Sequence, residues 1–177
     1  MIQAARVDST RLKLIICRLE TGTAYRNPHE AGDVVASASS LNGNIMNFVQ
    51  HSHEQPVYIF TDNATNSWMS VDLGEGRALV PDHYCLRSDR HSGHKLRNLQ
   101  LQGSLDGTTW QTLLRHENDA SLAGVAMSTA AWPVDAGGQG YRHFRIFLTG
   151  QTSFGNHHLM CAGIELYGRA KFERPLA

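Results

Sequence analysis

The chain has 177 residues, and its sixteen Lys and Arg balance sixteen Asp and Glu, so its formal net charge at pH 7 is zero. A chain of this length folds as one domain around a single core. A neutral chain has no global positive field to attract nucleic acid or an anionic membrane. The apolar run at 12–19 is interrupted by charged side chains and is too short to span a bilayer. We therefore expect no nucleic-acid partner and no membrane partner.

The three cysteines, Cys17, Cys85 and Cys161, are too few, and odd in number, for a disulfide framework. Each lies in an apolar, strand-like run, where a free cysteine is commonly buried. We expect three reduced thiols. This favours a cytoplasmic or nuclear location, as a protein in its own right or as part of a larger one.

Strand-like segments recur along the chain, separated by clusters of Gly, Asn, Asp and Ser, and no window keeps a helical apolar period. Many short strands with turn residues between them predict an all-β fold, either a β-sandwich or a jelly roll. The charged segment 169–177 is expected to fray. The expected strands are 12–19, 34–39, 57–60, 68–73, 78–80, 83–87, 98–104, 110–115, 130–134, 141–148 and 162–167.

The stretch LQLQGSLDGTTW (99–110) predicts a β-hairpin. Its leucines and glutamines alternate, so the leucines should face the core while Gln100 and Gln102 face water. The Asp-Gly pair in the middle supplies the turn, because aspartate bonds its own backbone and glycine accepts a positive φ. We expect Trp110, at the end of the stretch, to be a core residue.

Several short motifs, taken in order, resemble the discoidin family, the coagulation-factor type C domains. They are ASASS (36–40), WMSVDLG (68–74), SLDGTTW (104–110), YRHFRI (141–146) and GIELYG (163–168). Further motifs are similar to the discoidin-like domains of HECT-type ubiquitin ligases and of BTB-containing proteins. These are YRNP (25–28), LRN (96–98), HEND (116–119) and AWP (131–133).

The resemblance implies an eight-stranded jelly-roll sandwich of the galactose-binding type over residues 25–168. An N-terminal extension (1–24) with an added strand would precede it, and the tail (169–177) would follow. It also implies a non-catalytic recognition module, whose ligand loops lie opposite the turn at 104–110. Extracellular members join their ends by a disulfide, and no cysteine stands at those places here. Membrane-binding members carry apolar spikes, whereas the matching loop 88–94 is polar.

Counting strand directions on this fold brings loops 41–55, 87–97 and 151–158 to one rim, which we expect to be the ligand site. Loop 87–97 gathers four Lys and Arg against one acid. Arginine forks suit carboxylate or phosphate, so we expect a protein or peptide partner, preferably acidic. An ordinary charged loop with a structural Arg97 is an equally good reading. The expected ligand-binding residues are Arg87, Arg90, His91, His94, Lys95, Arg97, Asn63, Phe154, Asn156 and His157.

Two other functions remain open. A carbohydrate-binding, lectin-like domain should expose aromatic side chains over the same rim. A metal-dependent enzyme would use the ten histidines, but no zinc-ligand spacing, nucleophile elbow or phosphate-binding glycine loop is present. Asp62 and Asn63 offer oxygens to calcium, although such residues more often cap their own turn. We therefore expect no catalytic activity, no metal and no cofactor.

Overall fold

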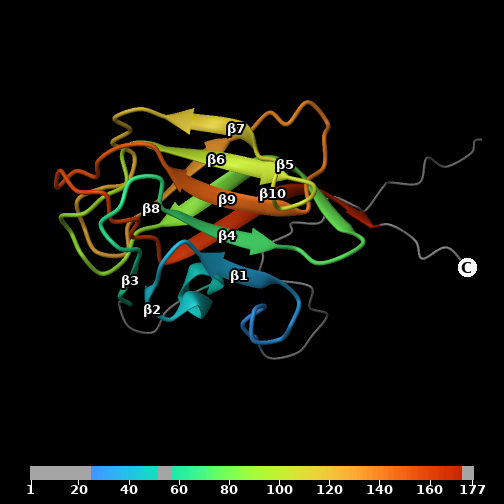
Figure 1. The fold of residues 1–177 in the computed structure, drawn as a ribbon, viewed down its shortest axis with the longest axis horizontal. Coiled ribbons are helices and arrows are strands. Elements are labelled where there is room, and N and C mark those ends of the chain that lie inside the picture. Colours follow the sequence, from blue (N-terminus) through green and yellow to red (C-terminus); the bar gives the residue numbers. More distant parts are fainter. Residues whose placement is uncertain (1–24, 52–56, 173–177) are drawn as a thin grey trace, which may run out of the picture.

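The computed structural model describes residues 25–51 and 57–172, and in them two β-sheets face each other (Figure 1). One sheet has the strand order β1-β4-β9-β6-β7 and the other β10-β5-β8, while β2 and β3 form a small separate pair. The two large sheets therefore hold eight strands, and the expected all-β jelly-roll sandwich is confirmed. The strands are β1 (Val35–Ala38), β2 (Asn42–Gly43), β3 (Ile59–Phe60), β4 (Trp68–Asp72), β5 (Arg77–Arg87), β6 (Leu99–Ser104), β7 (Gln111–His116), β8 (Thr129–Pro133), β9 (His143–Leu148) and β10 (Gly163–Phe172).

The core forms between the two sheets from side chains that alternate along the strands. In β9, Phe144, Ile146 and Leu148 are buried, and the residues between them are partly exposed. Tyr84 and Leu86 of β5 belong to the same buried cluster from the other sheet. Apolar side chains at every second position thus turn one face of each strand towards the core, as the sequence predicts.

Strand β5 is a single strand of eleven residues, whereas the sequence predicts two strands separated by Pro81. Proline is tolerated here because β8 pairs only with residues 83–87. On that side Pro81 therefore lies at an unpaired edge and needs no N–H donor. Its partner on the other side is Gly168, at the register shift of β10.

Strand β10 continues to Phe172, so the expectation that the chain frays from residue 169 is wrong for 169–172. These residues pair with 77–80 at the start of β5. The expected strand at 12–19 and the end of the tail lie outside the described residues, as does Cys17. Cys85 and Cys161 are free thiols, and burial raises the pKa of Cys161 to about 12.

The turn after β6 lies at the end of the sandwich where β4 finishes and β9 begins, which we call the far end. The Asp106 carboxylate accepts hydrogen bonds from the backbone N–H groups of Thr109 and Thr108, at 2.7 and 2.8 Å, and these lower its pKa. Trp110 is only half-buried, so its expected place in the core is wrong. Its ring is covered by the guanidinium of Arg145, 4.1 Å from the ring centroid.

Gln100 and Gln102 do not face water, contrary to the alternation in β6, because they are only 6% and 8% exposed. Arg145 donates to the Gln102 side chain at 2.6 Å, and Gln102 donates to Gln100 at 2.7 Å. Thr112 of β7 also donates to Gln100, at 2.9 Å. Long side chains on the neighbouring strands cover this outer face, and the hydrogen bonds among them offset the loss of water.

A second buried polar network connects β5, β7 and β8. The Tyr84 hydroxyl lies 2.5 Å from His116 Nε2, and His116 Nδ1 lies 2.6 Å from Asp119 Oδ2. Trp132 Nε1 donates to the same carboxylate oxygen at 3.0 Å. Partial burial by itself raises the pKa of Asp119, but hydrogen bonds from Ser121 and His116 outweigh it and lower the pKa from 3.8 to about 2.

This network predicts a loss of stability in acid. Because the folded-state pKa of Asp119 lies below the unfolded value, its contribution is present above pH 4 and disappears as the pH falls towards 2. The shift corresponds to about 2 kcal/mol of unfolding free energy. Asp119→Asn should flatten the decrease measured by urea unfolding between pH 6 and pH 3. The exposed Asp135→Asn should leave it unchanged, and equal slopes for the two variants would contradict this role.

Candidate ligand-binding rim

The loops that leave the strands opposite the far end form one rim, at the left of Figure 1. Arg87 at the end of β5 pairs with Gly163 at the start of β10, and Leu99 of β6 pairs with Leu148 at the end of β9. Loops 88–98 and 149–162 therefore meet there, as direction counting predicts. Loop 117–128, between β7 and β8, joins them at the same end.

The candidate loop 41–55 is mostly structural over its described part. Its middle is a short 3-10 helix (Ile45–Val49), started by Asn44, whose side chain accepts from the N–H of Met46. Phe48 and Val49 of this helix are buried in the core. Arg87 donates to the backbone carbonyls of Gln50 and His51, at 3.3 and 2.7 Å. The Arg87 guanidinium thus anchors this segment.

Lys95 is 1% exposed, so the expectation of an outward ammonium group is wrong. Its Nζ donates to Ser88 Oγ at 2.7 Å and to the carbonyl of His91 at 2.6 Å. Burial lowers the pKa of Lys95, and the nearby Asp89 carboxylate opposes that shift. Asp89 is itself buried and accepts from the N–H of His91 and contacts its Nδ1, at 3.0 and 2.8 Å. The charged side chains of Lys95 and Asp89 therefore bond to other groups of the same loop.

A row of aromatic rings crosses the rim, and we call it the rim aromatic cluster. Phe154 is 68% exposed and Tyr58 is 39% exposed. Neighbouring ring centroids lie 4.4 to 6.5 Å apart along the row. Arg90 lies over the Tyr58 ring, 4.7 Å from its centroid, and is exposed. The cluster consists of Tyr58, Phe60, His91, His94, Phe154 and His158.

The three remaining expected residues fasten the loops to one another. Asn63 accepts from the N–H of His157 at 2.8 Å. The Asn156 side chain contacts His94 Nδ1 at 2.9 Å and accepts from Thr152 at 2.8 Å. These residues fix the shape of the rim beside the aromatic cluster.

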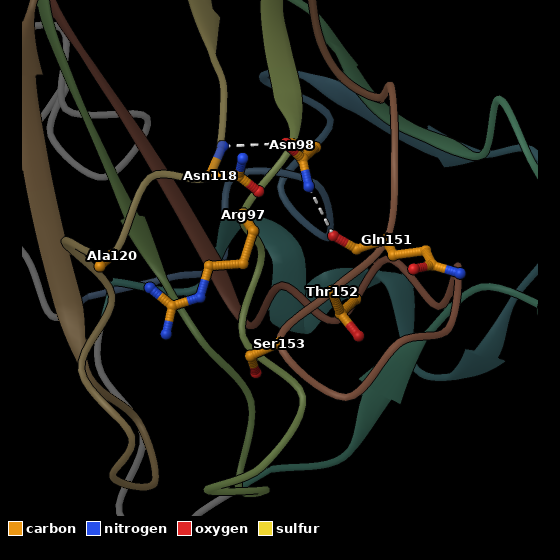
Figure 2. A pocket seen from close by; sticks show the side chains of 7 residues that line it. All are labelled: Arg97, Asn98, Asn118, Ala120, Gln151, Thr152 and Ser153. Atoms are coloured by element: carbon orange, nitrogen blue, oxygen red, sulfur yellow. Dashed lines mark hydrogen bonds between the residues drawn. The ribbon is translucent and has the colours of Figure 1, made fainter.

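A polar pocket of about 390 Å³ opens beside the cluster, and we call it the rim pocket (Figure 2). Arg97 reaches across it, with its guanidinium between Ala120 and Ser153. The structural reading of Arg97 is partly right, because its Nη1 donates to the carbonyl of Asp119 at 3.0 Å. The pocket is lined by Arg97, Asn98, Asn118, Ala120, Gln151, Thr152 and Ser153.

Sequence reasoning missed Tyr58 and Phe60 of the cluster, and also Asn98 and Asn118 of the pocket. The alternation in Val-Tyr-Ile-Phe (57–60) could have revealed the first two, because Ile59 is fully buried and its neighbours face the other way. The motifs LRN (96–98) and HEND (116–119) contain these asparagines but do not indicate that they line a pocket. Asn98 precedes β6 and Asn118 follows β7, and the pairing of these two strands brings them together.

The side chains of the two proposed calcium ligands, Asp62 and Asn63, hold other loops and do not cap their own turn. Asp62 Oδ1 accepts from the Asn42 side chain at 3.0 Å, and the Asp62 backbone N–H donates to the Ser40 hydroxyl at 2.8 Å. Within the described residues no group of three or more His, Cys, Asp or Glu is arranged to hold a metal ion. No helix there has the length and apolar character needed to cross a membrane.

Three larger proteins resemble the chain in sequence. It is 41% identical over 114 residues to E3 ubiquitin-protein ligase Ufd4 of Drosophila melanogaster and 39% identical over 118 residues to E3 ubiquitin-protein ligase hecd-1 of Caenorhabditis elegans. These matches cover 62% and 65% of this chain but 4% of each ligase. A BTB/POZ domain-containing protein of Arabidopsis thaliana is 38% identical over 94 residues, 52% of this chain and 11% of that protein. No protein-family model matches.

Several solved structures with the same fold are named as carbohydrate-binding modules or lectins. CBM32-3 from a family 31 glycoside hydrolase of Clostridium perfringens superposes with a TM-score of 0.62 at 12% identity, covering 78% of this chain and 93% of that one. CpGH89CBM32-5 of the same organism, in complex with GalNAc-β-1,3-galactose, gives 0.59 at 12% identity, covering 77% and 96%. A fucolectin from striped bass (Morone saxatilis) serum gives 0.60 at 14%, covering 77% and 46%.

Proposed function

Since the chain is a discoidin-like domain that corresponds to a small part of larger proteins, we propose that it is a non-catalytic recognition module that binds a protein or peptide. The ligase and BTB relatives are those that the sequence motifs predict. They support a place in a ubiquitin ligase or adaptor. The free thiols Cys85 and Cys161 support a reducing location, cytoplasmic or nuclear.

The observation that carries this proposal is the rim itself. Exposed Tyr58 lies under the guanidinium of exposed Arg90, and exposed Phe154 belongs to the same aromatic cluster, on loops fastened to one another by hydrogen bonds. Tyr and Arg are enriched among the residues that dominate protein interfaces, and aromatic side chains in general are enriched at them. A rim of this composition presents apolar contact area and hydrogen-bond donors without a large rearrangement.

The preference for an acidic partner now depends on fewer residues. Arg87 and Lys95 bond to groups inside the protein, which leaves Arg90 and Arg97 near the ligand. Two guanidiniums still favour carboxylate over neutral groups, and binding should weaken as salt is raised.

Carbohydrate binding is the second candidate, and Phe154 is the observation that favours it. The exposed ring satisfies the expectation that a lectin-like domain carries aromatics on its rim. The imidazole of His94, with its ring centroid 4.4 Å from that of Phe154, offers a polar group beside it. The same ring therefore serves either ligand, and the experiment has to separate them.

Phe154→Ala should weaken ligand binding and leave thermal unfolding almost unchanged, because the ring is exposed. Phe172→Ala is the matched control, since that ring is 53% exposed but lies at the far end. We expect selection from a displayed random-peptide library to enrich sequences that bind the protein and Phe172→Ala. Phe154→Ala should bind the same peptides at least tenfold more weakly, in line with loss of an interface hot spot of about 2 kcal/mol.

The same three proteins are applied to a glycan array. Glycan binding that Phe154→Ala removes, with no peptide enriched, would replace the protein-binding proposal with the carbohydrate one. Peptides that bind Phe154→Ala and the unchanged protein equally would show that recognition lies elsewhere on the molecule.

A further inference from the structure

We propose that the rim pocket is a carboxylate-binding subsite, which receives an Asp or Glu side chain or the C-terminal carboxylate of a bound peptide. This inference rests on the proposed peptide-binding function and names the group that the peptide must carry. The pocket volume of about 390 Å³ lies within the range of small-molecule sites, so it accepts one residue with its carboxylate.

The charge of the lining supports an anion. Arg97 is the one charged residue among the seven that line the pocket, and the others are neutral. Within the described residues Arg97 has no carboxylate partner, because the nearest acid, Asp119, is held by His116, Trp132 and Ser121. Its guanidinium is therefore not neutralised by an ion pair of its own.

The walls of the pocket are held in place before any ligand arrives. Asn98 accepts from the N–H of Asn118 at 2.9 Å and donates to the carbonyl of Gln151 at 2.9 Å, as Figure 2 shows. Its side chain thus fixes loops 117–128 and 149–162 relative to β6. The N–H of Ser153 also donates to the carbonyl of Lys95, at 2.9 Å. A preorganised site loses less conformational entropy when a ligand binds.

Among the described residues that line the rim pocket, several hydrogen-bond donors have no partner within the protein. Arg97 uses Nη1 for the Asp119 carbonyl, which leaves the rest of its fork for a carboxylate. Within the described residues the side-chain amides of Asn118 and Gln151 make no hydrogen bond, and both residues are exposed. The Asn118 amide lies near Arg97 at the edge of the pocket, whereas the Gln151 side chain extends away from Arg97 (Figure 2).

A carboxylate matches this site better than a phosphate does. One guanidinium balances one negative charge. A phosphate monoester carries between one and a half and two negative charges near neutral pH, on the order of twice the positive charge that Arg97 supplies. The pocket adjoins Phe154 through Thr152 and Ser153. A peptide whose acidic residue enters the pocket therefore places a neighbouring side chain against the rim aromatic cluster.

The test uses NMR titration of the ¹⁵N-labelled protein with N-acetyl-glutamate methylamide, and with the glutamine analogue as the neutral probe. We expect saturable shifts at the amides of residues 97–98, 118–120 and 151–153 with the carboxylate probe alone. Arg97→Gln should weaken this binding at least tenfold, and Asn118→Ala should weaken it severalfold. Arg169→Gln is the matched control, because that arginine is exposed on β10 towards the far end.

Equal shifts with both probes, or carboxylate binding unaffected by Arg97→Gln and by Asn118→Ala, would overturn the proposal. Tighter binding of glucuronate or of the phosphoserine analogue would assign the pocket to an acidic sugar or to a phosphopeptide instead. If displayed peptides bind the protein but neither small probe does, the carboxylate subsite is rejected and the peptide-binding function stands. If the carboxylate probe binds but no peptide is enriched from the library, the peptide-binding function is rejected and the carboxylate subsite stands.

Discussion

Lys95→Glu is expected to unfold most of the protein, although a lysine in a basic loop looks replaceable. The new carboxylate would lie in a fully buried position near the buried Asp89, and the carbonyl of His91 and the Ser88 hydroxyl would lose their donor. Removing one partner from a buried charge network costs about 3 to 5 kcal/mol, and reversing the charge adds repulsion. This is comparable with the whole stability of a small domain, about 5 to 15 kcal/mol.

Urea unfolding followed by tryptophan fluorescence measures the effect. Lys95→Met keeps the side-chain length and should lose less stability than Lys95→Glu, because it buries no new charge. Arg90→Glu is the matched control in the same loop, and its change should stay within about 0.5 kcal/mol because that guanidinium is exposed. Equal stabilities for Lys95→Glu and Arg90→Glu would show that the Lys95 network contributes nothing.

Gly168→Ala should be the second severe substitution. Gly168 has a φ of +152° at the register shift of β10, where a Cβ atom would overlap the carbonyl oxygen of Val80 and lie 2.9 Å from Cα of Pro81. Both obstacles are backbone atoms of the central strand of that sheet, so neither can turn away. We expect a loss of about 3 kcal/mol or more from the clash and the strained φ together.

Gly32→Ala separates the two causes, because Gly32 also has a positive φ, +79°, but nothing lies within 4 Å of its Cβ position. It should cost about 1 kcal/mol, the strain of a left-handed backbone alone. Thermal unfolding of both variants gives the comparison. A Gly168→Ala protein as stable as Gly32→Ala would mean that the two strands separate at the bulge without cost.

The sandwich fold was predictable because strand alternation and turn residues can be recognised from short stretches of sequence. Alternation in 99–104 and 143–148 and the Asp-Gly turn at 106 locate the hairpin and the buried faces by short-range chemistry alone. Strand directions then bring loops 88–98 and 149–162 to one rim. The distribution of turn residues thus gives the architecture, together with the end of the molecule that carries the candidate site.

The environment of single polar side chains was not predictable, because it depends on contacts from distant parts of the chain. The backbone of Lys95 is bonded to Ser153 of loop 149–162, more than fifty residues away, and Gln100 is covered by β7 and β9. The segment 45–49 (Ile-Met-Asn-Phe-Val) shows no strand alternation, but it packs beside β1 and β10 and places Phe48 and Val49 in the core. A hydrophilic residue type indicates only that its side chain is exposed on average. At these positions, tertiary contacts bury the side chain instead.

The direction of β10 affects how a ligand on the rim is presented to the rest of a larger polypeptide. The strand starts at the rim with Gly163 and ends at Phe172, and ten residues at about 3.3 Å each span roughly 30 Å. Phe172, where the described part of β10 ends, therefore lies on the side remote from the rim. Linker length and stiffness beyond that point would then set the effective concentration of a captured protein near any neighbouring domain.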